Sequence, residues 1–270
     1  MVEISNKYKI NEKKFGYVNW IGMWTLYKKE VWRFLVVVIQ TVISPLVTSL
    51  LFLMVLSLAI GNDRGEVLGF PFITFLAPGL IAMQVIQQAF SHSSSSFMIG
   101  KIQGNIVDIL YAPLTAGEVT IATNLAACTR SIMIAFVSIF VFSFLVDLAF
   151  YSFAYILVFT FLGAFILSSI GIIVGLWAEK FDHMASATNF IIVPLSFLSG
   201  TFYSIDRLPN ILKFVSEWNP FFYIIDGFRY GFLGTADGSI KFGLYYLIIL
   251  SFFTWLAAYI LFKKGYKIKS

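Results

Sequence analysis

The stretch PLSFLSGTFYSIDRLPNILKFVSEWNPFFYIIDGFRYGFLG, residues 194–234, decides the fold of this chain. It begins as a membrane-type helix and stops at Ser199-Gly200. It then passes through two half-polar segments interrupted by prolines before another apolar run begins. Irregular backbone is tolerated at membrane depth only where protein or a cavity satisfies its polar groups. The stretch therefore predicts a helix that breaks and re-enters, which a simple membrane crossing would not need.

Composition places the whole chain in a membrane. Of its 270 residues, 59% are hydrophobic and only 12% are charged, whereas soluble domains carry about 25% charged residues. The lysines and arginines flank apolar runs instead of gathering in one cluster, which argues against nucleic-acid binding and for membrane topology. A single cysteine, Cys128, excludes a disulfide framework and a cysteine-based metal site.

Six apolar runs are long enough to cross the hydrocarbon core, which takes about 20 helical residues. They are residues 35–60, 71–90, 120–146, 151–177, 187–205 and 242–262. We therefore predict an all-α polytopic membrane protein with six transmembrane helices. Residues 1–34 form an N-terminal segment, residues 35–262 the membrane domain, and residues 263–270 a tail. Residues 99–118 and 200–241 are the polar connections after the second and fifth spans.

The placement of lysine and arginine predicts the orientation, because these residues are in excess on the cytoplasmic side. With six spans, fourteen lie on the side of the two chain ends: seven in residues 1–34, four in residues 263–270, and Lys101, Arg130 and Lys180. The other side has five: Arg64, Arg207, Lys213, Arg229 and Lys241. Both termini are therefore predicted to be cytoplasmic, and residues 200–241 external.

Before the first span, residues 15–33 have the pattern of an amphipathic helix. Trp20, Met23, Trp24, Tyr27 and Val31 follow helical spacing, and lysines, a glutamate and an arginine are interleaved with them. Tryptophan and basic residues in this arrangement are typical of a helix lying in the membrane interface. The alternative is a helix packed on a soluble partner.

The sequence offers no residues for catalysis or metal binding. A P-loop is missing, because Gly100-Lys101 lacks the upstream glycine and the hydroxyl residue that follows the lysine. His92 stands beside four serines, but without a second histidine or a carboxylate nearby in that span, so a polar helix end explains it better than a hydrolase or a metal site. His183 likewise lacks the spacing of metal ligands.

Residues 103–111 can form a short amphipathic helix on the inner face. Ile106, Ile109 and Leu110 would share one side, with Asn105 and Asp108 exposed. Ala112-Pro113 ends it, because a residue before proline disfavours the helical region. A short helix, a stop and a long helix together make a rigid lever, although an ordinary loop with one helical turn is the alternative.

Arg130 lies about ten residues inside the third span, where a charge needs a partner or water. Glu118 is about 18 Å away along the helix axis, which is too far for a direct bond. We therefore predict that Arg130 pairs with Glu30 and ties the interfacial helix to the lever. The alternative is that the span begins later and Arg130 snorkels to the surface.

Asp226 and Arg229 stand three residues apart and could pair on a helix. Because they belong to the external segment, a solvated face that holds the re-entrant helices is the favoured interpretation. A substrate site is the alternative.

Several strings, in this order and spacing, resemble the permease subunits of type-2 ABC exporters, the ABC-2 family. The resemblance is closest to the bacterial branch of YadH-type and nodulation-factor exporter permeases. The strings are Gln40-Thr41 with Pro45, Ala77–Ile81, Gly104–Leu114, Phe181-Asp182, Gly200–Ser204, Leu208-Pro209, Asn219-Pro220, Tyr223 and Gly227–Gly234. One departure is Lys101-Ile102-Gln103-Gly104, where members often carry a further arginine, so a basic contact is expected to be weaker here.

The resemblance implies a six-helix half-transporter of the bacterial inner membrane, paired as a homodimer. Each copy would bind a separate cytoplasmic ABC ATPase, which holds the ATP and magnesium, while this chain binds no cofactor. The implied ATPase-coupling residues are Gln103, Gly104, Asn105, Asp108, Leu110, Ala112 and Pro113. The implied external cap comprises Gly200, Phe202, Tyr203, Pro209, Asn219, Pro220, Asp226 and Arg229.

The implied function is export of a lipid-like, lipo-oligosaccharide, polysaccharide or hydrophobic drug substrate, whose binding residues the sequence does not identify. The main alternative is an ion-coupled secondary transporter, which should carry acidic or histidine residues in mid-span. An intramembrane enzyme would need a nucleophile–base or metal constellation. A passive channel would not need a coupling segment.

Overall fold

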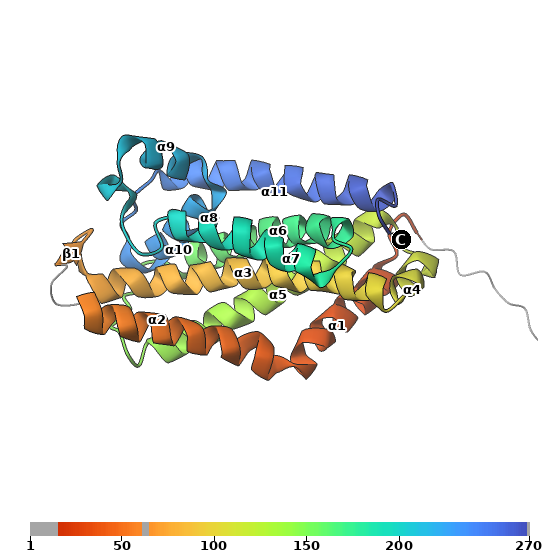
Figure 1. Cartoon of the computed structure of the whole chain (residues 1–270), viewed down its shortest axis with the longest axis horizontal. Helices are drawn as coiled ribbons and strands as arrows, with labels where there is room; N and C mark the ends of the chain where they lie inside the picture. Colours follow the sequence, from red (N-terminus) through yellow and green to blue (C-terminus); the bar gives the residue numbers. More distant parts are fainter. Residues whose placement is uncertain (1–15, 61–64, 269–270) are drawn as a thin grey trace, which may run out of the picture.

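A computed structural model describes residues 16–60 and 65–268 of the chain. It is built of long helices lying side by side (Figure 1). Five described helical stretches are long and apolar enough to cross a membrane: Ile39–Ala59, Phe72–Ile102, Ala116–Phe142, Phe153–Trp177 and Ile240–Lys263. The prediction of a mostly helical membrane protein is thus supported, and these stretches correspond to five of the six predicted spans.

The chain order explains which ends meet. Helix α1 (Trp20–Val36) leads through the π-helical turn η1 (Ile39–Ile43) into α2 (Ser44–Ile60), and a two-stranded hairpin, β1 (Glu66–Val67) and β2 (Phe70–Pro71), precedes α3 (Phe72–Ile102). After it come α4 (Ile106–Tyr111), α5 (Ala116–Phe142) and α6 (Phe153–Trp177). The start of α1, α4 and the end of α11 (Ile240–Lys263) lie at one end of the molecule, as Figure 1 shows. We call it the α4 end, and the opposite one the hairpin end.

The predicted span 187–205 takes a different course from the other five. Helical turns run without a break from Phe181 through α7 (Phe181–Ala187), the π-helical turn η2 (Thr188–Ile192) and α8 (Val193–Leu198). The helix thus begins six residues earlier than predicted and stops at Leu198 instead of Ile205. That this segment is a sixth crossing stays a prediction.

After α8 the helix breaks, as residues 194–234 predict, and the chain turns back into the bundle; that these segments are external and re-enter the membrane stays a prediction. A 3-10 turn, η3 (Ile205–Arg207), and α9 (Asn210–Trp218) lie at the hairpin end, and α10 (Pro220–Leu233) runs back between the long helices (Figure 1). Nearly every residue of α10 is buried. It packs chiefly on α6, α3 and α11, so it is part of the core and more than a cover over it.

Glycines allow the closest helix contacts. Gly171 and Gly175 of α6 form a Gly-x-x-x-Gly pair against α3, where a Cβ on Gly171 would lie 2.6 Å from the carbonyl oxygen of Phe90. Gly227 of α10 lies against the ring of Phe159, which a Cβ would meet at 2.2 Å. Small residues at such spacing let backbones approach, which is the main source of helix packing energy in a membrane.

Gly171→Ala should therefore destabilise the protein by about 1–3 kcal/mol, the usual cost of overpacking. The atom it meets is backbone and cannot swing aside. Gly117→Ala in α5 is the matched control, because its Cβ would lie 3.8 Å from Tyr259, an ordinary contact, and alanine favours the helix. Thermal unfolding in detergent micelles compares the two. An equal midpoint for both variants would contradict this account of the α3–α6 contact.

Candidate coupling site

The polar connection between α3 and α5 is a short, exposed elbow. Gly104, with φ of +76°, turns the chain after α3, and α4 then begins at Ile106, three residues later than predicted. Ile106 is buried in a small core with Leu26, Phe97 and Val119. Leu110, which was expected on the buried side with it, is exposed instead. The elbow is therefore anchored by Ile106 and presents its other side chains outward.

The predicted coupling residues lie on this elbow and remain free to contact a partner. Gln103, Gly104, Asn105, Asp108, Leu110 and Pro113 are exposed, and Ala112 is half-buried. The helix ends at Tyr111, and Ala112 is already extended with ψ of 144°. The stop before Pro113 is thus confirmed, for the predicted steric reason.

Glu118 fixes the elbow, a role that was not predicted from the sequence. Its carboxylate is buried and accepts the backbone N–H of Thr115 at 2.6 Å and that of Asn19 at 2.5 Å. Thr115 in turn accepts the N–H of Glu118 at 3.3 Å, which completes a capping box at the start of α5. One carboxylate thereby joins the beginnings of α1 and α5. The Thr115-x-x-Glu118 spacing was the available signal.

Asn19 completes this junction from the side of α1. Its amide accepts the N–H of Gly22 at 2.9 Å as the N-cap of α1 and donates to the carbonyl of Pro113 at 2.9 Å. A groove of about 530 Å³ remains between α1 and the elbow, bordered by Lys29 and Asp108. Helix α1 thus begins on the elbow and is bonded to it through Asn19.

The tail meets the same end of the molecule. Lys267 donates to the carboxylate of Glu179, beyond the end of α6, at 2.7 Å. This bond holds the pKa of Glu179 below its ordinary value and raises the pKa of Lys267. Both side chains are well exposed, so the contact adds little stability.

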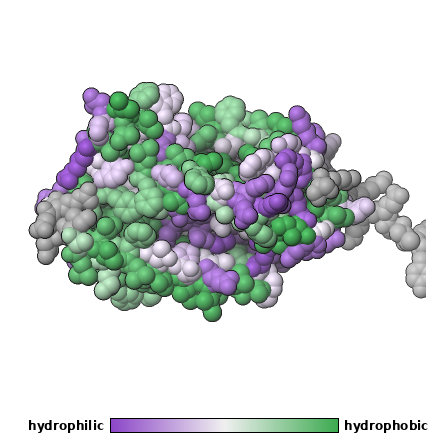
Figure 2. Space-filling model, in the orientation of Figure 1, coloured by the Kyte–Doolittle hydropathy of each residue, from purple (hydrophilic) through white to green (hydrophobic). Residues whose placement is uncertain are grey.

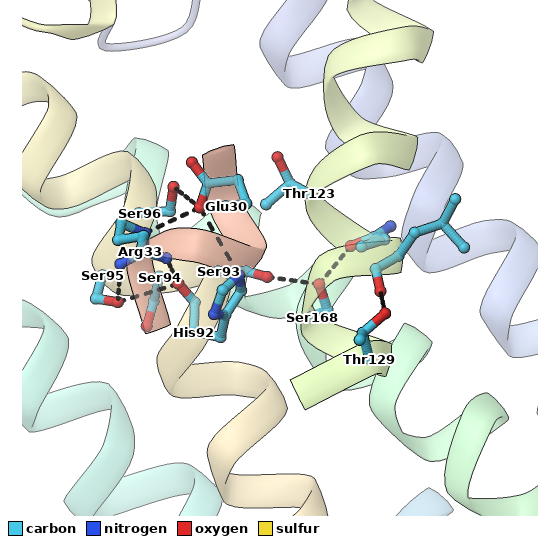
Figure 3. A network of polar contacts seen from close by, with 12 residues as sticks. Glu30, Arg33, His92, Ser93, Ser94, Ser95, Ser96, Thr123, Thr129 and Ser168 are labelled. Atoms are coloured by element: carbon cyan, nitrogen blue, oxygen red, sulfur yellow. Dashed lines mark hydrogen bonds and ion pairs between the residues drawn. The ribbon is translucent and has the colours of Figure 1, made fainter. Parts of the chain in front are cut away.

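The middle of α1 is attached to α3 by a buried polar cluster (Figure 3). Glu30, almost fully buried, accepts from Arg33 at 3.0 Å and from Ser96 at 2.8 Å, and lies 3.7 Å from the imidazole of His92. Arg33 also donates to the backbone oxygen of His92 at 2.9 Å. His92 itself is fully buried, so its interpretation as a polar helix end is wrong: it lies inside the bundle beside a carboxylate from another helix.

The predicted ion pair between Glu30 and Arg130 is wrong, because each side chain contacts other residues. Arg130 is buried, which also excludes the snorkelling alternative, and donates to the side-chain oxygen of Gln88 on α3. The polar contacts of Glu30 and Arg33 tie α1 to Ser96 and His92 of α3 instead of to the lever. Sequence distance could not reveal this, because the choice of partner depends on how α3 is rotated. That α1 lies in the membrane interface stays a prediction.

Charge reversal should accordingly fail to rescue: Glu30→Arg combined with Arg130→Glu restores neither stability nor transport. In a double-mutant cycle, Gln88→Ala and Arg130→Ala should show a coupling of about 1 kcal/mol, exceeding that of Glu30→Ala with Arg130→Ala. Chemical unfolding in detergent gives both numbers. A coupling energy between Glu30 and Arg130 larger than that between Gln88 and Arg130 would support the direct ion pair.

Next to this cluster, a chain of hydroxyl and amide groups links three long helices. Ser93 of α3 bonds Ser168 of α6 at 2.5 Å, Ser168 donates to Asn124 of α5 at 2.5 Å, and Asn124 donates to Ser169 at 2.9 Å. All four are buried. Polar side chains that satisfy one another in this way fix helix orientation within a membrane.

A second groove, of about 350 Å³, lies between α2, α3 and α8. Its polar lining comes from uncharged side chains of the described residues: Gln40, Ser44, Thr48, Ser49, Gln84, Gln87 and Gln88, with Phe52, Phe197 and Phe202 among its apolar walls. Figure 2 shows hydrophilic side chains in a hollow on the mostly hydrophobic flank between α2 and α3. Both π-helical turns adjoin it, since Gln40 belongs to η1 and Val193 follows η2.

At the hairpin end, Asp226 and Arg229 are almost fully buried, so the predicted solvated face is wrong. They also take different partners. Arg229 donates to the carbonyls of Phe75 at 3.3 Å, Gly200 at 2.8 Å and Thr201 at 3.4 Å, and stacks on the ring of Phe75. Asp226 accepts the N–H groups of residues 237 and 238 at 3.0 and 2.9 Å.

The remaining cap residues close the broken helix. Asn219 donates to Leu195 O at 3.0 Å and Ser199 Oγ at 2.8 Å, and caps α10 by accepting from Phe221 N at 3.1 Å, with Pro220 at the first helical position. Gly200, with φ of +72°, turns the chain after α8. Phe202, Tyr203 and Pro220 are half-buried and Pro209 is exposed. The carbonyls freed by the break are thus satisfied by protein groups, as the membrane requires.

Comparison with known proteins agrees with this architecture. The sequence model of the family described as ABC-2 type transporter matches residues 21–233. The chain is 31% identical over 253 residues to the inner membrane transport permease YadH of Escherichia coli strain K12, covering 93% of this chain and 98% of that protein. It is 24% identical over 228 residues to nodulation protein J of Rhizobium leguminosarum bv. viciae, covering 83% and 86% of the two chains. Against nodulation protein J of Rhizobium meliloti, identity is 24% over 218 residues, covering 80% and 82%.

Proposed function

This chain belongs to the ABC-2 type transporter family, and from that premise we propose that it is the membrane subunit of an ATP-driven exporter. ATP and magnesium would be bound by a separate cytoplasmic ABC ATPase, and two copies of this chain would form the membrane part. The substrate would be lipid-like, a lipo-oligosaccharide or polysaccharide, or a hydrophobic drug. The setting would be the bacterial inner membrane, with the α4 end and both termini in the cytoplasm.

The elbow is the observation that carries this proposal. It offers an exposed row of side chains from Gln103 to Pro113, while Ile106 and Glu118 hold its inner side firmly. A partner that pushes on α4 would therefore move α1 and α5 together, because Glu118 bonds the first turns of both. Packed helices joined by hydrogen bonds are one physical route by which coupling is carried between distant sites.

From α1 the displacement would pass to α3 through the buried cluster. Glu30 and Arg33 bond Ser96 and the backbone of His92 on α3. Four residues up the helix from His92, Gln88 borders the groove between α2, α3 and α8. We propose that this groove faces the transport path, because uncharged polar groups at membrane depth are costly unless they serve a ligand, a partner or water.

A cross-linking experiment tests the ATPase contact. The one cysteine of the chain, Cys128, is buried, so a cysteine introduced by Asp108→Cys is the accessible thiol. Co-expressed with a candidate partner ABC ATPase from the same organism, Asp108→Cys carrying a photoreactive thiol reagent should cross-link to the ATPase. Thr235→Cys, exposed at the hairpin end, is the control. A cross-link formed by Thr235→Cys would contradict the proposal that the elbow faces the ATPase. Failure of both variants to cross-link would contradict it as well.

The ion-coupled alternative gains one specific observation, the buried pair of Glu30 and His92, both ionisable. Proton coupling through this pair predicts transport that an uncoupler abolishes and that survives inactivation of the ATPase. Export driven by ATP predicts the reverse. Vesicles with a P-loop lysine variant of the ATPase, tested with and without uncoupler, separate the two functions.

A further inference from the structure

A crevice of about 300 Å³ lies on the flank of the molecule where α1 crosses α5 and α6. Met23, Trp24 and Tyr27 of α1 form its mouth, residues 122–132 of α5 its wall, and Phe161 of α6 its far side. It lies across α1 from the elbow groove, which residues such as Gly22, Leu26 and Lys29 border. The crevice therefore belongs neither to the elbow nor to the groove lined by glutamines.

The dimensions of the crevice match one leaflet of a bilayer. Its wall runs from Ala122 to Ile132, a rise of ten residues along the helix, which is about 15 Å. Half of a hydrocarbon core about 30 Å thick is the same length. Because the predicted third span begins at residue 120, a hydrocarbon chain lying along this wall would reach about the middle of the membrane.

The walls are suited to a hydrocarbon chain. The polar groups along them are already engaged: Tyr27 Oη and Thr129 Oγ1 bond each other at 2.9 Å, and Cys128 Sγ lies 3.8 Å from the carbonyl of Phe161. The other lining side chains are apolar. A polar ligand would find few free partners inside, whereas an acyl chain needs none.

The mouth carries a positive charge. Lys28 Nζ lies 5.3 Å from the centre of the Trp24 ring, which itself stacks on Tyr27 with centroids 5.0 Å apart. Within the described ranges Lys28 takes part in none of the ion pairs, and the acidic residue two positions on, Glu30, is turned into the buried cluster with Arg33. A lysine beside interfacial aromatic rings is the usual setting for an anionic headgroup.

We propose that this crevice binds one anionic phospholipid per chain, with an acyl chain between α1, α5 and α6 and the phosphate beside Lys28. The lipid would fill the space under α1 on the side that faces away from the elbow. It would thereby hold α1 against the membrane domain. Binding does not depend on the ATPase or on the direction of transport.

Native mass spectrometry of the purified protein tests the proposal without any transport assay. The protein is delipidated in detergent and mixed with equal amounts of phosphatidylglycerol and phosphatidylcholine that carry the same palmitoyl and oleoyl chains. One basic residue near an anionic headgroup contributes an interaction that corresponds to about a fivefold preference. We expect one retained phosphatidylglycerol per chain, favoured about fivefold over phosphatidylcholine.

Three variants and two controls test the headgroup contact and the acyl-chain contact separately. Lys28→Gln should abolish the preference, while Leu125→Trp, which fills the crevice, should reduce retention of both lipids. Lys29→Gln, across α1, and Leu58→Trp, on the exposed face of α2, should behave as the unaltered protein does. Because Leu125→Trp could fail to fold, Trp24→Ala opens the mouth at an exposed position and should also weaken retention. Equal retention of both lipids by the unaltered protein, or loss of binding in the controls alone, would overturn the proposal.

Discussion

Replacing Glu118 by alanine should detach α1 from the elbow and strongly reduce the proposed ATP-driven transport. The change removes the capping box of α5, worth about 1 kcal/mol. It also leaves the buried N–H of Asn19 without its acceptor, at a further cost of about 1–3 kcal/mol. We expect a loss of about 3 kcal/mol in the free energy of unfolding, measured in detergent. Transport into inside-out vesicles should fall at least about tenfold, because each 1.4 kcal/mol shifts an equilibrium by that factor.

The controls distinguish the junction from a general effect of removing a charge. Glu118→Gln keeps one side-chain oxygen as an acceptor, so it should lose less stability than Glu118→Ala. Glu217→Ala, exposed in α9, should stay within about 0.5 kcal/mol of the unaltered protein. Hydrogen exchange should rise at residues 19–26 in Glu118→Ala and stay low in both controls. Unchanged exchange there, together with full transport, would show that the elbow does not act through α1.

Replacing Arg229 by methionine should cost about 3–5 kcal/mol, since it removes a buried partner from several groups at once. The carbonyls of Phe75, Gly200 and Thr201 lose their donor, and the ring of Phe75 loses its stacked guanidinium. These bonds attach α10 to α3 and to the broken end of α8. Arg229→Met should therefore unfold at a much lower temperature and lose transport.

Arg229→Lys should recover only part of this loss, because an ammonium group cannot reproduce the planar fork of the guanidinium. The matched control is Arg207→Met, whose side chain is exposed and, among the described residues, reaches the carbonyl of Glu66 at 3.5 Å. It should change the unfolding temperature little. Equal effects at both positions would restore the sequence-based interpretation of Arg229 as part of a solvated face.

The long elements followed from hydropathy, because a membrane leaves the chain few choices. Uninterrupted apolar runs such as 151–177 must be helical, since every backbone group has to be satisfied within the segment, and α6 covers 153–177. The break at Ser199-Gly200 and the stop before Pro113 were also local in origin. Both depend on backbone preferences of glycine and proline, which act within one or two residues.

Two local motifs in the sequence indicate features of the site that were not predicted. The Thr115-x-x-Glu118 capping box is a recognised start signal for a helix, and Gly171-x-x-x-Gly175 is a helix-packing signal. Either would have marked a residue that the structure makes important. Neither would have shown that the second acceptor bond of Glu118 comes from Asn19, 99 residues earlier in the chain.

The partners of the buried charges could be decided only by tertiary structure. Glu30 faces Ser96 and His92 instead of Arg130, and Arg229 faces backbone carbonyls instead of Asp226 or solvent. A charge pattern says that a buried ion needs a partner, but the partner depends on the rotation and depth of neighbouring helices. The hydrophobic membrane and local backbone preferences therefore made the helices and their breaks predictable from the sequence alone. Helix packing, in which glycines set the distances between backbones, decided which polar groups meet.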